Sequence, residues 1–307
     1  MRILILCNDR LALPAISQLL PSGIVSGIGM TDQPTETHGL VQQLCTQTKI
    51  PLQHFSKKKF AGELLAWLEQ HKPDVVLVKT FPWKIPAAAL TIPQSGFINF
   101  HYAPLPQWRG SNPLFWMIRN RASSGGVTIH RMDEEFDTGP ILLQKQVALS
   151  SESTFGFFCT QLAFTAADLT LQLLQGIQAN SLTSKPQEHT KAKWYGRPKP
   201  QDLFIDWKGM SAYEIKALVK ACNPWNKAAP TRHNGWTFGI TDASVAMLPA
   251  NKTAAPGTVL ALDESKGLLI ACCEGILKAE VIYCEEGYFP GHKLALFGVS
   301  AGSVLGN

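Results

Sequence analysis

The chain has 307 residues, of which 45% are hydrophobic and 17% are charged, a composition typical of a soluble globular protein of two domains or one large domain. The formal net charge of +5 favours anionic ligands such as nucleotides, but it is far below that of a dedicated nucleic-acid-binding protein. No stretch approaches 18 consecutive apolar residues, so we expect no membrane-spanning helix.

The first half of the chain alternates short apolar runs with segments of helical periodicity. The apolar runs predict β-strands at residues 3–6, 24–30, 74–78 and 97–100. Helices are predicted at 11–20 and 58–71, the second with Ser56 as a candidate N-cap. Apolar strands that alternate with helices indicate a mostly parallel sheet covered on both faces.

Two further strands and a long helix complete this part of the chain. The strands are predicted at 126–130 and 141–149, and the helix at 154–175, with Gly176 at the position of a C-terminal cap. Together these elements predict a Rossmann-like α/β domain over residues 1–182.

The chain changes character after this domain. Residues 183–202 are polar and contain several Lys, Arg and Pro, so we predict an inter-domain linker there. Ser211 and Glu214 then form the pattern of a capping box at the start of a helix. Further short strands are predicted at 237–240, 257–262, 268–272 and 277–283. Residues 203–307 are therefore expected to form a small C-terminal β-barrel of the OB type.

Three patterns argue against other chemistries. Residues 7–12, after the first strand, lack the G-x-G-x-x-G pattern of a dinucleotide site. Gly298–Gly302 matches the G-x-S-x-G nucleophile pattern, but its acid and histidine would have to follow, and only five residues remain. No metal site is expected, because the candidate ligands lack a C-x-x-C spacing: Cys272, Cys273, Cys284 and His292.

The cysteines and the start of the chain bear on the cellular compartment. The seven cysteines are odd in number and lack the spacing of a disulfide framework, so we expect reduced thiols. The apolar start at 3–6 is too short for a signal peptide and is followed at once by Asn8, Asp9 and Arg10. These features predict a cytoplasmic protein.

The side chains with the most chemical potential are Asn99, His101 and Asp137. Asn99 and His101 close the strand at 97–100, and Asp137 opens an Asp-Thr-Gly turn between two later strands. An amide donor, an imidazole and a carboxylate at the end of one sheet can stabilise an oxyanion and move a proton. The trio therefore predicts an acyl-type group transfer, with the acceptor open.

Four motifs lie in order around this trio. They are Asn-x-His at Asn99–His101, Leu-Pro-x-aromatic-Arg-Gly at Leu105–Gly110, Gly-Val-Thr-Ile at Gly126–Ile129, and Met-Asp-x-x-x-Asp-Thr-Gly at Met132–Gly139. This arrangement resembles the 10-formyltetrahydrofolate-dependent formyltransferase family over most of residues 1–180. Two later pieces resemble the C-terminal domain of methionyl-tRNA formyltransferase and its sugar-modifying relatives: Phe204–Trp207 and Asn223–Trp225.

The resemblance implies an enzyme that transfers a formyl group from N10 of 10-formyltetrahydrofolate to an amine. The amine would attack the formyl carbon, and Asn99 together with a protonated His101 would stabilise the oxyanion of the tetrahedral intermediate. Asp137 would pair with His101, raise its pKa and help to relay the proton through water. This chemistry implies no metal.

The family pattern also assigns binding residues. The pterin of the folate would lie between the loop after strand 74–78 and the segment 132–137, with contacts from Phe81, Trp83, Ile85, Pro86, Met132, Glu135 and Phe136. A substrate loop would follow His101 and include Tyr102, Pro104, Leu105, Pro106, Arg109 and Gly110.

Two segments bear on the acceptor, and both favour a small molecule over tRNA. Methionyl-tRNA formyltransferases carry a loop rich in Gly, Arg and Lys after the second strand, whereas Thr31–Gly39 contains no Lys or Arg. Trp194–Pro200 resembles the linker of sugar-nucleotide formyltransferases, although a solvated basic linker explains it equally well. We therefore expect a nucleotide-linked amino sugar as the acceptor, with methionyl-tRNA as the alternative.

A third interpretation, of a different class, is a folate-binding or folate-hydrolysing protein without transferase activity. The presence of all three residues Asn99, His101 and Asp137 argues against an inactive scaffold, which has no chemical need for them. The sequence leaves open the oligomeric state, a homodimer included, and the role of the C-terminal domain.

Overall fold

The computed structural model describes residues 1–246 and 254–306 and divides into two compact units. The first unit consists of Met1–Pro113, Gly125–Ala148 and Cys159–Tyr195. The second contains Leu114–Ser124, Leu149–Phe158 and the chain from Gly196 onward. Residues 183–195, within the stretch predicted as a linker, are part of the first unit.

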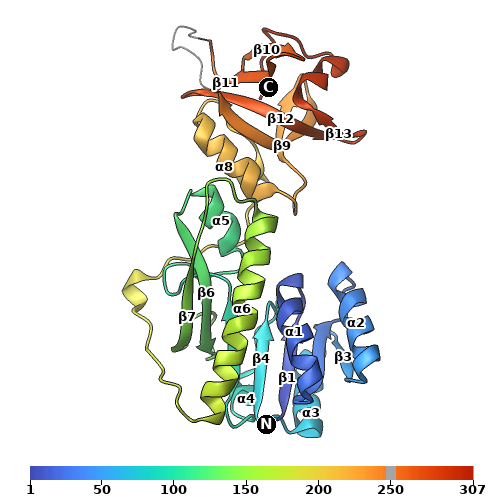
Figure 1. Cartoon of the computed structure of the whole chain (residues 1–307), viewed down its shortest axis with the longest axis vertical. Coiled ribbons are helices and arrows are strands. Elements are labelled where there is room, and N and C mark those ends of the chain that lie inside the picture. The colour runs from blue at the N-terminus through green and yellow to red at the C-terminus, as the bar shows by residue number, and fades with distance from the viewer. Residues whose placement is uncertain (247–253, 307) are drawn as a thin grey trace. The chain divides into compact units, whose positions relative to one another are not determined.

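A seven-stranded, mostly parallel sheet forms the core of the first unit (Figure 1). Its strand order is β3-β2-β1-β4-β5-β6-β7. β1 to β5 run parallel to their neighbours, whereas β6 is antiparallel to β5. This sheet confirms the predicted Rossmann-like fold. The strands are β1 Ile3–Cys7, β2 Val25–Thr31, β3 Leu52–Phe55, β4 Val75–Lys79, β5 Phe97–His101, β6 Ser124–Arg131 and β7 Ile141–Ala148.

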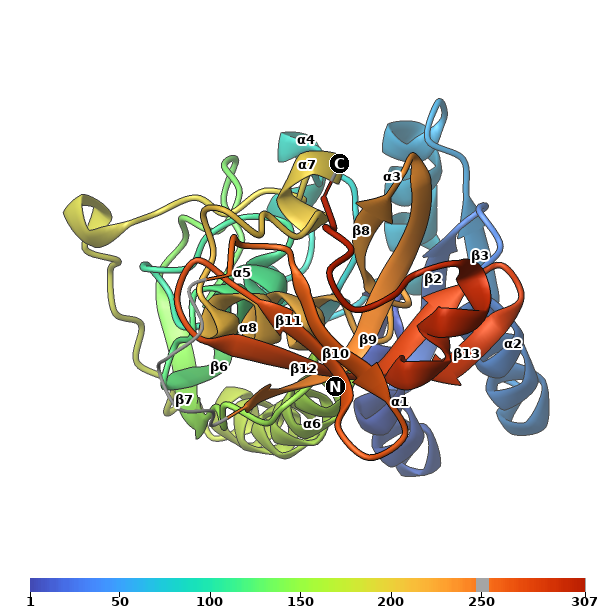
Figure 2. The same cartoon turned by 90° about the horizontal axis from the view of Figure 1, so that it is seen from above.

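Helices cover both faces of this sheet, as Figure 2 shows from above. On one face lie α1 (Leu13–Leu19), α2 (Glu36–Thr48) and α6 (Phe155–Gln178), and on the other α3 (Phe60–His71) and α4 (Ala87–Leu90). Short 3-10 turns at Arg10–Ala12, Leu20–Ser22 and His189–Lys191 complete the unit. Because both faces are covered, the central strands are fully buried, which explains their continuous apolar sequences.

Two predicted helix ends are wrong. α6 does not stop before Gly176 but continues to Gln178, and a Cβ at Gly176 would lie 2.5 Å from the Leu182 side chain, so the glycine lets the segment after the helix pack closely against it. Ser56 does not cap α3, whose N-cap is Lys59. Instead the Ser56 backbone N–H donates to Glu63 Oε2 at 3.0 Å, which satisfies a donor just before the helix.

α6 is the one helix among the described residues that is long and apolar enough to cross a membrane. Of the most apolar stretch of this helix, 56% is buried inside the protein, and the core helix of a soluble protein can be equally long and apolar. This helix is therefore weak evidence for a membrane span.

The second unit is built on an antiparallel sheet of six strands, in the order β10-β11-β12-β9-β8 with β13 paired to β12. Its strands are β8 Ala229–His233, β9 Trp236–Ala246, β10 Val259–Asp263, β11 Gly267–Ala271, β12 Ile276–Cys284 and β13 Gly287–Pro290. The unit also holds α5 (Pro113–Arg119), α7 (Pro200–Leu203), α8 (Ala212–Cys222) and a 3-10 turn at Gly291–Phe297. These strands confirm an antiparallel C-terminal domain, although β8 and β13 were not predicted.

The capping box at the start of α8 is confirmed. The Ser211 backbone N–H and hydroxyl both donate to Glu214 Oε2 at 2.8 Å, and the Glu214 N–H donates back to Ser211 Oγ at 3.3 Å. The helix packs on β9 and β12 and buries most of its apolar side chains there.

Candidate active site

The carboxyl end of β5 brings the predicted trio together. Asn99 and His101 are two residues apart on the strand and therefore lie on the same face of the sheet. β6 runs antiparallel beside β5, so that His130 is the register partner of Asn99. The loop between β6 and β7 returns Asp137 to this point, where its Oδ1 lies 3.4 Å from His101 Nδ1 and 3.8 Å from His130 Nε2.

Asp137 is a largely buried carboxylate that faces one backbone N–H and the ring nitrogens of two histidines. The Gly110 backbone N–H donates to its Oδ2 at 2.9 Å, while the two imidazoles approach Oδ1. Burial alone would raise the pKa of Asp137, but the charge that His101 carries when it is protonated, together with the nearby His130 and the Gly110 N–H, outweighs it and lowers that pKa to about 2. Asp137 therefore stays ionised at neutral pH.

His101 is buried, with 6% of its surface exposed, and both of its ring nitrogens face acceptors. Nε2 lies 2.6 Å from the carbonyl oxygen of Trp108, which can only accept, so Nε2 carries a hydrogen. Burial lowers the pKa of His101 despite the opposing effects of Asp137 and of this carbonyl. Asp137 thus acts in the direction that the sequence predicts, but desolvation is larger, and the resting imidazole is neutral rather than protonated.

His130 is a site residue that the sequence analysis missed. Its Nδ1 lies 2.8 Å from the carbonyl oxygen of Arg131 and donates to it, which leaves Nε2 as an acceptor in the neutral ring. Asn99 Nδ2 donates to that Nε2 at 3.1 Å. This bond fixes which end of the Asn99 amide is the donor and leaves its second N–H free for another acceptor. The signal was a histidine at the end of a strand predicted next to the Asp-Thr-Gly turn.

Most of the predicted substrate loop is buried scaffold. The Tyr102 hydroxyl donates to the Leu11 carbonyl at 3.1 Å, away from the trio. Arg109 Nη2 contacts Gln187 Oε1 at 2.7 Å and His189 Nδ1 at 3.1 Å. Of the residues predicted for this loop, Gly110 is the one with a hydrogen bond to the trio, and the loop also supplies the Trp108 carbonyl to His101. The remaining members are buried in the loop: Pro104, Leu105 and Pro106.

The residues predicted to hold the folate lie on the loops after β4 and β6, the two strands that flank β5. Phe81, Trp83 and Met132 are partly buried and pack on the hydrophobic core, although they come from the loops after β4 and after β6. Lys84 Nζ and Glu135 Oε1, 3.5 Å apart, link the same two loops. Three others lie along these loops: Ile85 is buried, Pro86 is half-buried, and Phe136 is exposed. The two loops thus form one apolar wall with exposed aromatic edges, which fits a flat heterocycle.

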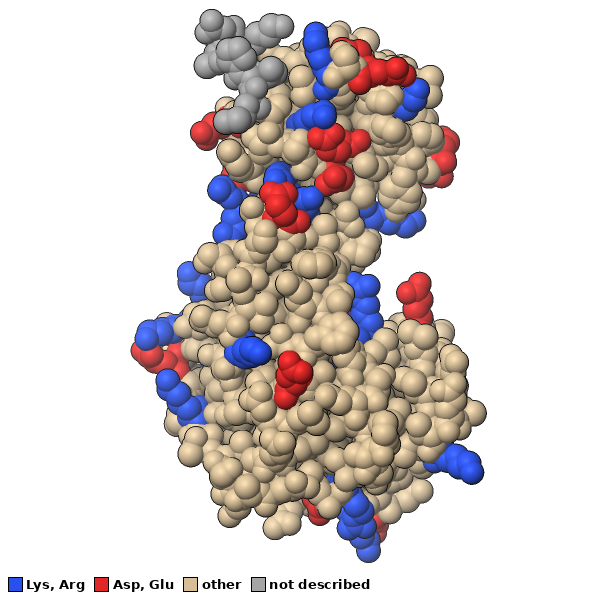
Figure 3. All heavy atoms as spheres, in the orientation of Figure 1, with Lys and Arg blue, Asp and Glu red and all other residues tan. Residues whose placement is uncertain are grey.

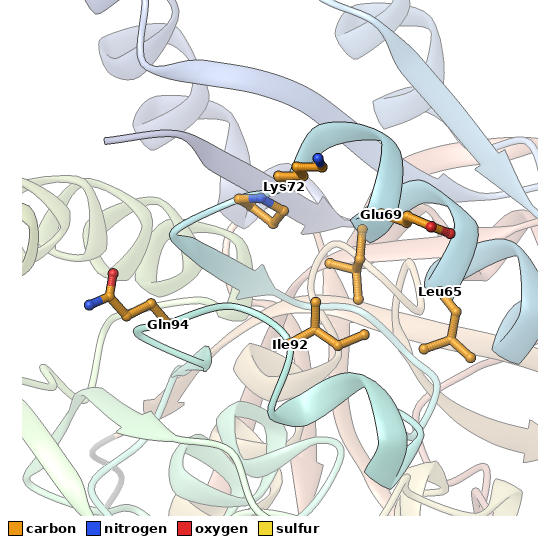
Figure 4. Close-up of a pocket in the computed structure, with 7 residues that line it drawn as sticks. Leu65, Glu69, Lys72, Ile92 and Gln94 are labelled. Atoms are coloured by element: carbon orange, nitrogen blue, oxygen red, sulfur yellow. The ribbon is translucent and has the colours of Figure 1, made fainter.

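A hollow of about 510 Å³ has none of the trio in its lining (Figure 4). Its walls come from the end of α3 and from the segment after α4, and it contains no predicted site residue. The lining is Leu65, Leu68, Glu69, Lys72, Pro73, Ile92 and Gln94. Within the described residues there is also no group of three or more His, Cys, Asp or Glu that could hold a metal ion.

Two family models match the sequence, one in the N-terminal part and one in the C-terminal part of the chain. Residues 11–172 match the formyl transferase model, and residues 197–287 match the model of the formyl transferase C-terminal domain. The chain belongs to the formyl transferase family. The predicted family and enzyme class are thereby confirmed.

Two curated relatives of this formyl transferase carry the same name. The "Methionyl-tRNA formyltransferase" of Pseudomonas fluorescens strain Pf-5 is 33% identical over 77% of this chain and 72% of its own length. The protein of the same name from Synechococcus sp. strain JA-3-3Ab is 31% identical over 95% of this chain and 92% of its own length.

Solved structures of similar fold have lower identity. WlaRD, a sugar 3N-formyl transferase crystallised with dTDP and 5-N-formyl-THF, matches with a TM-score of 0.65 and 16% identity over 90% of this chain and 96% of its own. HypX from Aquifex aeolicus, in complex with tetrahydrofolic acid, matches with a TM-score of 0.65 and 18% identity over 97% of this formyl transferase. The formyl transferase spans only 47% of HypX. These likenesses show the fold.

Proposed function

We propose that this formyl transferase takes its formyl group from 10-formyltetrahydrofolate and passes it to a primary amine, with Asn99, His101 and Asp137 as its catalytic residues. The observation that carries the proposal is the convergence of the three side chains at the end of β5. An oriented amide donor lies there beside a neutral imidazole that is backed by a buried carboxylate.

Each residue has a role that its contacts support. The second N–H of Asn99 donates to the oxyanion that forms when the amine attacks the formyl carbon. His101 is neutral at rest and takes up, through water, the proton that the amine loses. The resulting imidazolium faces the Asp137 carboxylate, which stabilises it until the proton passes to the N10 atom of the leaving folate. One proton leaves the amine and one reaches the folate, so the transfer balances.

The apolar wall formed by the loops after β4 and β6 supports a folate as the donor. Phe81, Trp83 and Met132 offer partly exposed apolar surface on the loops that follow β4 and β6, the neighbours of the strand that carries Asn99, and such a surface suits a pterin ring. The match to the formyl transferase models covers this wall. WlaRD and HypX, which share the fold, were crystallised with folate derivatives.

For the acceptor, the sequence comparisons support methionyl-tRNA better than the amino-sugar nucleotide that the sequence alone predicts. Eight curated relatives, 28 to 34% identical, are all methionyl-tRNA formyltransferases. The sugar enzymes are similar in fold at 16 to 20% identity. We therefore take the α-amino group of methionyl-tRNA as the first candidate.

A small-molecule amine is the second candidate, and one structural feature favours it. β2 ends at Thr31 and α2 begins at Glu36, so the connection has only four residues, and it contains no Lys or Arg. A tRNA needs phosphate contacts from basic side chains, which this connection does not supply. On the face drawn in Figure 3, the Lys and Arg of the described residues are scattered among Asp and Glu instead of forming a broad patch.

Parallel assays with the two candidate acceptors test which amine is formylated. The protein is incubated with 10-formyltetrahydrofolate and either methionyl-tRNA or a dTDP-linked amino sugar, and the formylated product is identified by mass spectrometry. Formyl-methionyl-tRNA, formed at a rate that falls steeply with salt, supports the first candidate. A formylated sugar without a tRNA product supports the second. Release of formate alone contradicts both and supports a folate hydrolase.

A further inference from the structure

Gln187 is buried although it lies in a polar stretch, with 6% of its surface exposed. Its Nε2 donates to two backbone carbonyls, of Asp137 at 3.0 Å and of Gly139 at 2.8 Å. Its Oε1 accepts from Arg109 Nη2 at 2.7 Å. Every polar atom of this amide is therefore used, and its partners are the loop of the catalytic carboxylate and the substrate loop.

The Asp137 loop needs such support. Asp137 has a φ of +57°, in the left-handed region that costs a residue with a side chain about 1–2 kcal/mol. That backbone conformation directs the carboxylate toward His101 and the Gly110 N–H. On the other side of Thr138, a Cβ at Gly139 would collide with the Arg131 carbonyl oxygen, so the loop is packed tightly against β6. The two bonds from Gln187 hold the carbonyls on both sides of Thr138.

Gln187 can hold the loop because its own segment is fixed on both sides. Before it, Lys185 exchanges two backbone hydrogen bonds of 2.8 Å with Ile141 at the start of β7. After it, the Arg109 N–H donates to the Lys193 carbonyl at 2.9 Å, and the Tyr195 N–H donates to the Arg109 carbonyl at 2.7 Å. The segment 185–195 is thus anchored to the start of β7 at one end and to the loop around Arg109 at the other.

We propose that Gln187 is a positioning residue, which holds the Asp137 carboxylate against His101 through its hydrogen bonds to the carbonyls of Asp137 and Gly139. The inference rests on the proposed role of Asp137 in formyl transfer. It places a determinant of the proton-transfer pair on a segment fifty residues later in the chain, outside the four motifs that surround the trio.

The test is a histidine titration by NMR, which needs no acceptor. Protein labelled with ¹⁵N-histidine is titrated as wild type, as Gln187→Met and as Glu188→Gln, and the His101 signal is identified by its loss in His101→Gln. Gln187→Met keeps the length of the side chain but removes its hydrogen bonds to the loop. Glu188→Gln is the matched control, since Glu188 is exposed and pairs only with Lys191 at its surface. Unfolding by urea is measured for each variant.

If Gln187 positions Asp137, the midpoint of the His101 titration moves to lower pH in Gln187→Met, because a displaced carboxylate no longer stabilises the imidazolium. In Glu188→Gln the midpoint is unchanged. A His101 titration that is unchanged in a less stable Gln187→Met protein overturns it and leaves Gln187 a purely structural role. If Gln187→Met does not fold, Gln187→Asn, which keeps a buried amide one methylene too short, decides in the same way.

Turnover separates this inference from the function on which it rests. With methionyl-tRNA as acceptor, Gln187→Met should lower kcat about 10- to 100-fold at unchanged KM for the folate, since small misplacements of catalytic groups have such effects. In an Asp137→Asn background the same change should lower kcat no further. Additive losses overturn the positioning role alone. Full activity of Asp137→Asn overturns the proposed function as well, whereas the titration can be read in either case.

Discussion

Asn99 Nδ2 lies 3.1 Å from His130 Nε2 across the antiparallel pair of β5 and β6. An amide nitrogen only donates. Because His130 Nδ1 donates its hydrogen to the Arg131 carbonyl, Nε2 is the ring nitrogen that can accept from Asn99. The histidine thereby decides which way the Asn99 amide points. An oxyanion donor that is oriented before the reaction is worth more than one that must reorganise.

His130→Ala is expected to lower kcat about 10- to 100-fold, because Asn99 can then rotate its amide away from the oxyanion. His130→Gln places an oxygen acceptor close to the position of Nε2 and should recover much of the rate. The measurement is steady-state turnover of both variants, with folate binding followed by fluorescence. Equal losses in His130→Ala and His130→Gln would mean that His130 does not act through Asn99.

The unfolding free energy of the first unit should decrease as the pH falls below neutral. His101 has a lowered pKa in the folded protein, so the unfolded chain binds more protons, and the unfolding free energy decreases as pH falls below about 6.5. Urea unfolding between about pH 7 and pH 5 should therefore show a smaller pH dependence for His101→Gln than for wild type. An equal dependence would show that His101 is not desolvated as its burial implies.

Asp137 contributes in a lower and separate pH window. Its folded pKa of about 2 lies below the ordinary value of 3.8, which corresponds to about 2 kcal/mol of stabilisation that is complete above pH 3.8 and lost as pH falls through about 2. The acid limb of an activity profile above pH 5 can therefore come from His101 but not from Asp137.

Lys79 is the most unusual buried group outside the site. Its side chain is fully buried at the end of β4, donates from Nζ to Thr170 Oγ1 at 3.0 Å and lies 3.2 Å from the centre of the Phe100 ring. Burial lowers the pKa of Lys79 well below its ordinary value. Lys79→Met should therefore raise the unfolding free energy by about 1–3 kcal/mol at neutral pH.

The pH dependence of this gain gives the prediction its check. The unfolded chain binds a proton at Lys79 that the folded protein disfavours, so wild-type stability rises with pH up to the ordinary pKa near 10.5. The advantage of Lys79→Met in urea unfolding should shrink from about pH 6 to about pH 9. A gain that is the same at both pH values would contradict the assigned desolvation of the amine.

Gly110 meets two demands that alanine cannot meet. Its φ is +111°, and a Cβ at this position would collide with the backbone of Tyr195, which holds the substrate loop. Gly23 is the matched control, with a φ of +70° and open space around it. Gly23→Ala should lower the unfolding free energy by about 1–2 kcal/mol. Gly110→Ala should lower the unfolding free energy clearly more and should also lower the turnover rate. Equal losses of unfolding free energy for Gly110→Ala and Gly23→Ala would show that the Tyr195 backbone can move aside to accommodate the added Cβ.

The sequence predicts the centre of the first unit better than its edge. β1, β4 and β5 are buried on both faces, and their apolar runs mark them clearly. α2 and β3 escape prediction because α2 buries only four side chains and β3 is a short edge strand with one buried residue. Edge elements have little hydrophobic signal.

The trio could be predicted, but the residues that hold it could not. Asn99, His101 and Asp137 have side chains of evident chemistry in turn-rich sequences. The role of His130 depends on the register between β5 and β6, which sets Asn99 opposite it and which no local pattern reveals. Gln187 lies in a sequence typical of a solvated linker, and its burial comes from tertiary hydrogen bonds alone.

The most direct test of the account is the rate of formyl transfer from 10-formyltetrahydrofolate in a single turnover, for wild type and for Asp137→Asn, with methionyl-tRNA and a dTDP-linked amino sugar as acceptors. We predict that wild type formylates one of these amines. Asp137→Asn should be slower by a factor of about 100 or more while it still binds the folate, since the imidazolium of His101 loses its counter-charge. A near-normal rate in Asp137→Asn, or no formylated amine from wild type, would contradict the account.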